Sequence, residues 1–292
     1  MKIAFGSVVY KEGLLYADEF IDSLNQQTAI KNVDVVLLND NLSAEDMNNI
    51  ISKLNKPPII LYNDHGLKPH ELRVELISKT KRMGYDLLIF GDFDDTWSND
   101  RIEQYIDQFQ AGYAFFYNDL YKRDGALFFS STPFETESYY KILESNYLGL
   151  STTGIVLPMI EETTIDMLGL CQQPVFDWYL YTILLKLGHK GKKIVNAKTY
   201  YRLHANNLAG IVNISDEHVI KELNVKIDHY NSLRSVGAEF QKKHSFYSHL
   251  YNVFFESPNK LIEYVDLSDN YWWGLLKESK LKGVITNEYK WS

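Results

Sequence analysis

Apolar and polar positions alternate in a regular rhythm along the first hundred residues. Short runs that are apolar throughout predict buried strands at residues 2–10, 33–38, 59–62 and 87–90. The stretches between them carry apolar side chains at helical spacing, around residues 14–24, 47–54 and 72–83. Continuous apolar strands are typical of a parallel sheet covered by helices on both faces. The pattern therefore predicts an α/β fold with a mostly parallel central sheet.

Start and stop signals agree with this rhythm. Ser43 and Asp46 have capping-box spacing at the start of one helix, and Pro57 follows its end. A later helix from about Trp178 ends at Gly188, a residue type that is common just beyond helix C-termini. These signals make each element short and well bounded.

The second half of the chain has a less regular pattern. Residues 113–117, 126–129 and 194–201 predict further strands, of which the first two would form an irregular antiparallel part. From residue 215 onward, apolar positions from Val219 to Val236 predict one long helix. We expect a catalytic domain in residues 1–212 and a C-terminal helical region in residues 213–292.

Three carboxylates directly follow the strand at 87–90, namely Asp92, Asp94 and Asp95. Acidic side chains cannot continue a buried strand, so the strand should end at the rim of the sheet. Strand alternation would place Asp92 and Asp94 on one side and Asp95 on the other. Carboxylates aimed at one spot repel unless a cation lies between them, and Mg²⁺ uses one or two carboxylates together with water and phosphates. Asp40 ends another strand at the same edge, where ligands of α/β sheets bind.

The motif at residues 92–96 has three interpretations by itself. It is similar to the Asp-x-Asp signature of glycosyltransferases, to the Asp-x-Asp-x-Thr nucleophile motif of haloacid-dehalogenase-type phosphatases, and to a polar turn before a helix capped by residues 98–100. The phosphatase motif belongs on the first strand and requires a second acidic pair downstream. This chain has several strands and helices before the motif and lacks the second pair.

Four segments together resemble family 2 glycosyltransferases of the A-type fold. They are the strand at 3–10 with residues 20–28, the strand ending in Asp40, residues 88–97, and residues 201–207. The resemblance covers about residues 1–210. It implies a Rossmann-like nucleotide-binding domain and an inverting sugar transfer.

The same resemblance implies a nucleotide site. Val9 and Tyr10 would line it, Asp40 would accept a hydrogen bond from the base, and Arg73 would approach the base or the diphosphate. Asp92 would face the ribose or a metal-bound water. Val8 and Lys11 depart from the proline and asparagine that such enzymes often carry, so the identity of the base stays open.

The resemblance also implies a divalent metal, Mn²⁺ or Mg²⁺. Asp94 would ligate it directly, Asp92 and Asp95 would share that role, and His204 would reach the metal or the diphosphate.

The catalytic base of the family follows a Glu-Asp pair, and this chain has Phe176-Asp177 in its place. The resemblance assigns the base to Asp177. A plain helix N-cap is the alternative role for this residue. Residues 148–154, a small-residue turn, would form either the acceptor side of the site or an ordinary loop.

The expected activity is transfer of a hexosyl group from a nucleotide-diphosphate sugar, with a UDP-sugar favoured, to the hydroxyl of a saccharide or lipid-linked acceptor. Surface polysaccharide or glycoconjugate synthesis is the expected context. A sugar nucleotidyltransferase is an alternative, although residues 6–11 lack its glycine-rich basic loop. A non-catalytic nucleotide-sugar-binding protein is another, because the acid before Asp177 is missing.

Composition narrows the class of protein further. With 292 residues and 45% apolar composition the chain can bury a large core, and its formal charge of -8 argues against nucleic-acid binding. One cysteine, no signal-like N-terminus and no long apolar window lead us to expect a cytoplasmic protein without a membrane span. The tyrosine- and lysine-rich C-terminal region leaves open peripheral contact with the inner face of a membrane, a homo-oligomer interface, or packing on its own core.

Overall fold

The computed structural model describes all residues except 64, 174, 203–213, 256–258, 269–270 and 282–292. Within the described part, one mixed sheet has the strand order β3-β2-β1-β4-β8-β6-β9-β5, and β7 pairs with β9. The strands are β1 Ile3–Tyr10, β2 Asp34–Asp40, β3 Ile59–Tyr62, β4 Leu87–Phe90, β5 Thr96–Trp97, β6 Phe115–Lys122, β7 Glu135–Thr136, β8 Thr153–Val156 and β9 Gly191–Tyr201. The α-helices are α1 Ala17–Asn25, α2 Ala44–Lys53, α3 Pro69–Arg82, α4 Arg101–Asp107, α5 Glu162–Gly169, α6 Phe176–Lys186, α7 Asp216–Ser232, α8 Ala238–Phe254 and α9 Asn259–Ile262. Short 3₁₀ helices are η1 Lys11–Tyr16, η2 Ile30–Asn32, η3 Tyr139–Ile142, η4 Leu150–Thr152 and η5 Leu157–Met159.

The predicted α/β fold is confirmed, and its parallel part is the N-terminal half. Strands β3, β2, β1 and β4 run parallel to one another. From β4 onward the sheet becomes mixed, because β8 is antiparallel to both β4 and β6, whereas β6 and β9 are parallel. The carboxyl ends of β1 and β4 therefore meet at one edge, where the acidic motif follows β4.

Two segments differ from the predicted elements. Residues 126–129 form only an isolated bridge between Tyr121 and Leu127, after a turn in which Gly125 has a φ of 85°. The long helix expected to reach Val236 ends at Ser232, and α8 starts after Gly237. Apolar spacing continued across that break, so periodicity alone could not locate it.

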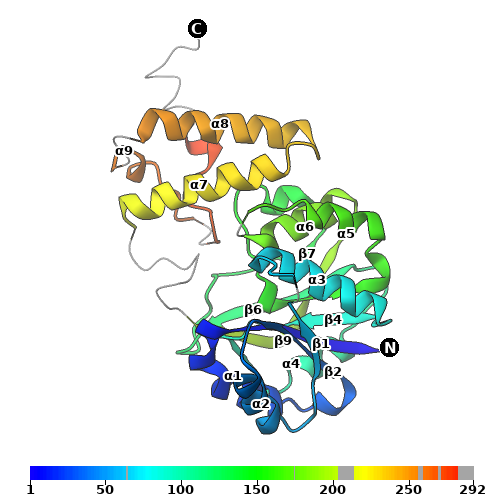
Figure 1. The fold of residues 1–292 in the computed structure, drawn as a ribbon. Helices are drawn as coiled ribbons and strands as arrows, with labels where there is room; N and C mark the ends of the chain where they lie inside the picture. Colours follow the sequence, from blue (N-terminus) through cyan, green and yellow to red (C-terminus); the bar gives the residue numbers. More distant parts are fainter. Residues whose placement is uncertain (64, 174, 203–213, 256–258, 269–270, 282–292) are drawn as a thin grey trace.

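Two hydrophobic cores lie on the two faces of the sheet. One packs beneath α1, α2 and α4, and the other beneath α3, α5 and α6. Figure 1 shows these two layers, with α7 and α8 as a further layer outside α5 and α6. The second core continues into this outer layer, where the ring of His229 stacks on Trp178 with centroids 3.9 Å apart. The division into residues 1–212 and 213–292 stays a prediction.

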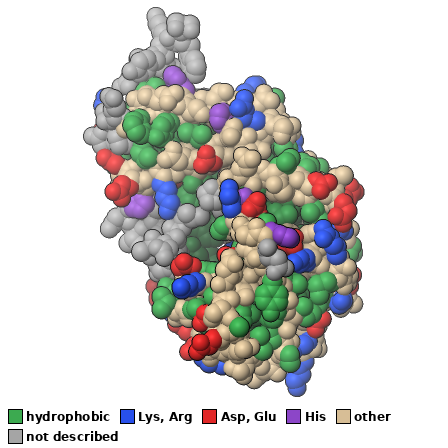
Figure 2. All heavy atoms as spheres, viewed as in Figure 1, with side chains coloured by type: hydrophobic (Ala, Val, Ile, Leu, Met, Phe, Trp, Pro, Cys, Tyr) green, Lys and Arg blue, Asp and Glu red, His purple; other side chains and the backbone are tan. Residues whose placement is uncertain are grey.

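The surface adds two observations. On the face shown in Figure 2, basic and acidic side chains are interspersed, and the α7–α8 layer meets the sheet-bearing body at a recess. None of the helices in the described part of the chain is both long and apolar enough to span a membrane.

Candidate active site

The acidic motif forms a tight turn at the end of β4. Gly91 donates its backbone N–H to Gly6 at 3.1 Å, and a Cβ at position 91 would lie 2.3 Å from the ring of Phe5. The chain then turns, because the amide of Asp95 donates to the carbonyl of Asp92 at 3.1 Å. The expected strand alternation of the three acids is therefore wrong, and all three line one pocket.

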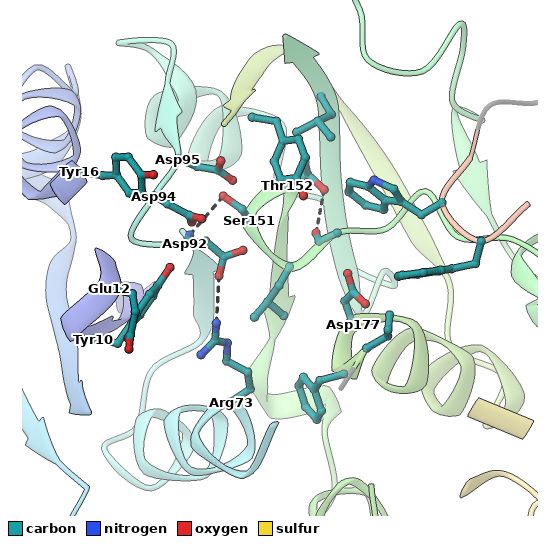
Figure 3. A pocket seen from close by; sticks show the side chains of 18 of the residues that line it. Tyr10, Glu12, Tyr16, Arg73, Asp92, Asp94, Asp95, Ser151, Thr152 and Asp177 are labelled. Atoms are coloured by element: carbon teal, nitrogen blue, oxygen red, sulfur yellow. Dashed lines mark hydrogen bonds and ion pairs between the residues drawn. The ribbon is translucent and has the colours of Figure 1, made fainter. Parts of the chain in front are cut away.

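This pocket has a volume of about 600 Å³, within the range of small-molecule sites. Figure 3 shows Asp177 across the pocket from the three acids, with Ser151 and Thr152 between them. The lining residues come from both halves of the sequence and are Tyr10, Glu12, Leu15, Tyr16, Arg73, Asp92, Asp94, Asp95, Leu120, Gly149, Leu150, Ser151, Thr152, Val175, Phe176, Asp177, Tyr201, Trp272 and Trp273.

Burial and repulsion between neighbouring carboxylates raise the pKa values of Asp92 and Asp95. Burial is the main cause of the raised pKa of Asp95, which is 2% exposed, and the charges of Asp94 and Asp92 raise it further. Burial also raises the pKa of Asp92, and the Arg73 guanidinium, 3.4 Å from its carboxylate, opposes that shift. A bound cation would relieve this repulsion.

The donor set fits a divalent cation that takes further ligands from its substrate. Among the described residues no group of three His, Cys, Asp or Glu side chains is arranged to hold a metal alone. Carboxylates gathered at one pocket wall nevertheless suit Mg²⁺ or Mn²⁺ that completes its shell with water and phosphate oxygens. His204 lies outside the described residues.

A buried arginine that sequence reasoning passed over supports the turn from below. Arg101 is 0% exposed and donates to the carbonyls of Phe90 at 2.9 Å and Ser151 at 2.8 Å. Its Nε donates to the side-chain oxygen of Asn118 at 3.0 Å. The sequence did contain a sign of this role, because Arg101 directly precedes the apolar face of a helix. A cation in that position is unusual unless its charge has buried partners.

Arg202 fixes the turn from the other side. Its backbone amide donates to the carboxylate of Asp95 at 3.1 Å, and its Nε donates to the carbonyl of Asp94 at 3.0 Å. Its guanidinium also donates to Glu19 at 2.7 Å and lies 4.3 Å from the ring centre of Tyr16. The segment at residues 201–207 drew attention in the sequence, and its second residue, Arg202, does lie at the acidic turn.

Asp177 lies on the first turn of α6. The N-cap of this helix is Val175, so Asp177 is not the cap, although its carboxylate accepts the amide of Trp178 at 2.6 Å. Burial raises the pKa of Asp177 to about 7, and the charge of Asp92 adds to the shift. A carboxylate that titrates near neutrality is suited to accept a proton during a reaction.

Of the remaining predicted site residues, Tyr10 lines the pocket, whereas Val9 and Asp40 do not. Tyr10 lines the pocket, and burial together with the nearby acids raises the pKa of its hydroxyl. Val9 is 0% exposed and packs in a core, so it is not among the pocket-lining residues. Asp40 also lies outside the lining, where it accepts hydrogen bonds from Asn41 and Asn63, both at 2.9 Å.

A tryptophan-bearing segment closes the far side of the pocket. We call residues 271–276 the tryptophan wall, of which Trp272 and Trp273 line the pocket. A Cβ on Gly149 would lie 2.6 Å from the Trp272 ring, so the wall packs directly on the turn at 148–154. The sequence drew attention to the turn at 148–154 and to the aromatic C-terminal region separately and gave no sign that they meet.

A mixed, curled sheet flanked by helices, with acids at the end of β4, is the architecture of A-type glycosyltransferases. Residues 7–159, just over half of the chain, match the sequence profile described as glycosyl transferase family 2. The chain belongs to this family. No curated protein matches its sequence significantly.

Solved structures support the fold. S. aureus TarS 1-349 in complex with UDP is 14% identical, with a TM-score of 0.53, and the match covers 91% of this chain and 76% of that one. The mannosyltransferase PcManGT from Pyrobaculum calidifontis, in complex with GDP-Man and Mn²⁺, is 9% identical, with a TM-score of 0.55 and coverage of 90% and 78%. GalNAc-T7 with UDP, GalNAc and Mn²⁺ is 11% identical, with a TM-score of 0.54 and coverage of 82% and 49%. At these identities the similarity concerns the fold alone.

Proposed function

We propose that this glycosyltransferase moves a hexosyl group from a nucleotide-diphosphate sugar, with a UDP-sugar favoured, to an acceptor hydroxyl with inversion. The acceptor would be a saccharide or lipid-linked glycan in surface polysaccharide or glycoconjugate synthesis. The observation that carries the proposal is Asp177 facing Asp92, Asp94 and Asp95 across one pocket (Figure 3). Residues 1–212 would form the catalytic unit, to which the helical region 213–292 is added.

The acidic turn would hold Mn²⁺ or Mg²⁺, with Asp94 as the main ligand and Asp92 and Asp95 beside it. When bound, such a cation neutralises the charge that develops on a departing diphosphate. The raised pKa values of Asp92 and Asp95 are consistent with this assignment, because burial is their main cause and repulsion between the neighbouring carboxylates adds to it. PcManGT and GalNAc-T7, which share the fold, contain Mn²⁺. His204 would add to this group.

The nucleotide would lie between the acidic turn and the end of β1. Tyr10 presents an aromatic ring at the pocket, and Arg73 presents a cation that already pairs with Asp92 at 3.4 Å. An arginine in this position can bind diphosphate oxygens. Val9 would support the nucleotide side of the pocket from the core. Asp40 at the end of β2 would accept a hydrogen bond from the base.

Asp177 would act as the general base. Its carboxylate takes the proton of the acceptor hydroxyl while the acceptor oxygen forms a bond to the anomeric carbon. The bond from that carbon to the diphosphate oxygen breaks, and the nucleoside diphosphate leaves with the electron pair. A single displacement from the opposite face inverts the anomeric centre.

Ligand-induced thermal stabilisation tests the donor assignment. Uridine, guanosine and thymidine diphosphate sugars are titrated with and without Mn²⁺, since a ligand that binds only the folded state raises the melting temperature. We expect stabilisation by a UDP-sugar that depends on Mn²⁺, and release of nucleoside diphosphate once an acceptor is present. No stabilisation by any of these donors with Mn²⁺ would overturn the proposal.

Asp94→Ala tests the metal assignment in the same assay. We expect the Mn²⁺-dependent part of the donor stabilisation to disappear, because the main carboxylate ligand is gone. Asp107→Ala removes an exposed acid on α4 and is the matched control. Equal Mn²⁺ dependence in the two variants would contradict the role of Asp94.

A further inference from the structure

Backbone hydrogen bonds attach the tryptophan wall to the sheet-bearing body. The amide of Asn146 donates to the carbonyl of Trp272 at 2.8 Å, and the amide of Trp272 donates to the carbonyl of Asn146 at 3.0 Å. The hydroxyl of Tyr271 donates to the carbonyl of Ser131 at 2.8 Å. These hydrogen bonds hold the tryptophan wall next to the turn at residues 148–154.

The outer helical layer holds the other end of the wall. Glu222 on α7 is 1% exposed, and its carboxylate accepts the amides of Leu275 at 3.2 Å and Leu276 at 2.7 Å. The hydroxyl of Tyr247 on α8 donates to the carbonyl of Leu276 at 3.0 Å. The helices α7 and α8 therefore serve as a scaffold for a segment that faces the active site.

The two tryptophans are held differently. The Trp272 ring packs edge-on against Phe129, with centroids 4.9 Å apart, and also contacts Phe128 and Tyr201. No aromatic ring of the described residues packs on Trp273, which is 8% exposed and lines the pocket. Trp272, which is partly buried, thus anchors the wall through its ring contacts, and Trp273, a buried member of the core, borders the cavity.

Two unfavourable features persist at this wall. Trp273 has a φ of 61°, a backbone conformation that bulky residues rarely adopt. The Nε1–H of Trp272 is buried and has no acceptor within the described part of the chain. Costs of this kind are retained where the surrounding structure enforces them, and they cluster at ligand sites.

The chemistry of the pocket differs between its two sides. Asp92, Asp94, Asp95 and Arg73 occupy the side of the proposed donor, and Asp177 lies across the pocket from the acids (Figure 3). The rest of the lining includes Tyr201, the two tryptophans and aliphatic side chains. A flat aromatic face next to hydroxyl and carboxylate groups suits a ligand with an apolar ring face and a polar rim. A pyranose ring has that character, and a phosphorylated alkyl chain does not.

We propose that the tryptophan wall is the acceptor subsite and that Trp273 stacks on a pyranose ring, so that the acceptor is a saccharide. This inference rests on the proposed glycosyl transfer and adds the class of acceptor. It also gives the C-terminal helical region a role inside the active site.

Saturation-transfer NMR on the full chain tests the inference. The probes are the methyl β-glycosides of glucose, galactose and N-acetylglucosamine, each with and without saturating UDP and Mn²⁺, and dodecyl phosphate represents a lipid acceptor. For the unaltered chain we expect at least one glycoside to receive saturation at its ring C–H protons. Trp273→Ala should weaken that binding by about tenfold or more, a loss like the one that alanine substitution causes where nucleic-acid bases stack on aromatic side chains.

Matched variants separate loss of the ring from loss of the fold. Phe255→Ala removes an aromatic side chain that is 57% exposed just beyond α8 and should leave glycoside binding unchanged. Trp273→Gly removes the same ring and relieves the positive φ, so it should fold even where Trp273→Ala does not. Trp273→Phe should restore part of the binding.

Calorimetric titration of the same samples with UDP-sugar and Mn²⁺ distinguishes the two proposals. Donor binding that is equal in the Trp273 variants and the unaltered chain, with glycoside binding lost only in the variants, supports the wall. Absence of donor binding in the unaltered chain overturns the proposed function, whatever the glycosides do. Glycoside binding that Trp273→Gly leaves intact, or binding of dodecyl phosphate alone, overturns the wall as a saccharide subsite.

Discussion

Asp177 experiences burial and negative charge that act in the same direction. Burial disfavours its carboxylate form, and Asp92 repels it, whereas the amide of Trp178 and the charge of Arg73 favour ionisation. The balance places its pKa at about 7. A base of this strength is deprotonated for much of the time at neutral pH and still binds a proton well, which is the compromise that general-base catalysis requires.

Asp177→Asn should abolish this proton acceptor while keeping the shape of the site. We expect kcat to fall by about 10²- to 10⁴-fold, the usual contribution of a general base, with donor affinity unchanged. Steady-state rates and calorimetry with the donor measure the two quantities. Asp166→Asn, at an exposed acid on α5, is the control and should retain the parental rate. Transfer by the Asp177 variant at that same rate would disprove the role of Asp177.

The pKa of Asp177 also predicts the pH dependence of the reaction. Below about pH 7 the carboxylate is protonated and cannot accept a second proton, so kcat/KM should fall by tenfold for each pH unit. Above that value kcat/KM should reach a plateau. Initial rates between pH 5 and 9 measure the profile. The inflection should be absent from the residual activity of Asp177→Asn, and its persistence there would assign it to another group.

At the scale of the elements, the acidic turn depends on the absence of a side chain at position 91. A Cβ there would lie 2.3 Å from Phe5 on β1 and 2.5 Å from Trp97 on β5. The turn is thus positioned by side chains of two strands, β1 and β5, which are not adjacent in the sheet. Because this packing involves residues far apart in the sequence, no local pattern could have shown which way Asp95 points.

Gly91→Ala should therefore destabilise the fold and displace the acids. We expect a loss of about 1 to 3 kcal/mol in the free energy of unfolding, typical of overpacked sites. Chemical denaturation measures it. Gly169→Ala is a matched control on α5, because a Cβ there would meet no atom within 4 Å. Similar stability of the two variants would contradict the steric argument.

The elements themselves were predictable where local pattern and packing agree. Strands β1, β2 and β4 are mainly apolar because both of their faces are buried, and the cap at Ser43 forms the expected bond with the amide of Asp46 at 3.1 Å. The segment at 126–129 is apolar for a different reason, since Phe128 and Phe129 pack against Trp272 instead of extending the sheet. An apolar segment indicates that its side chains are buried, but it does not show which residues they pack against.

At the scale of the whole molecule, a buried ion pair joins the outer helices to the rest. Lys226 and Glu222 on α7 are 0% and 1% exposed, with Lys226 Nζ 3.7 Å from the Glu222 carboxylate. Lys226 also donates to the carbonyl of Glu144, close to the start of the 148–154 turn. Burial lowers the pKa of Lys226 to about 8. The pair links α7, the tryptophan wall and the sheet-bearing body in one network.

Glu222→Ala should break this network at its centre. Removing the carboxylate leaves the buried cation of Lys226 without its ion-pair partner and the amides of Leu275 and Leu276 without their acceptor. We therefore expect a loss of about 3 to 5 kcal/mol in the free energy of unfolding. Residues 271–276 should also become more accessible to limited proteolysis. Glu217→Ala, at an exposed acid on the same helix, is the control. Parental protease resistance and stability in the Glu222 variant would show that the wall is held by other contacts.

The site was predictable to the extent that its residues lie close together in the sequence. The acidic turn, Arg73 and Asp177 follow single strands or open single helices, so motif and resemblance pointed to them. Arg101 acts through carbonyls of two separate segments, and the tryptophan wall meets Gly149 only after the chain has folded. Such contacts have no periodicity or spacing that a sequence could display.

Close contact between Gly149 and Trp272 also constrains how this chain can diverge. The indole occupies the space that any larger residue at position 149 would need, since a Cβ there would lie only 2.6 Å from it. A descendant sequence can thus gain bulk at one of these positions only by giving it up at the other. The two residues should change together during evolution, although 123 positions separate them along the chain.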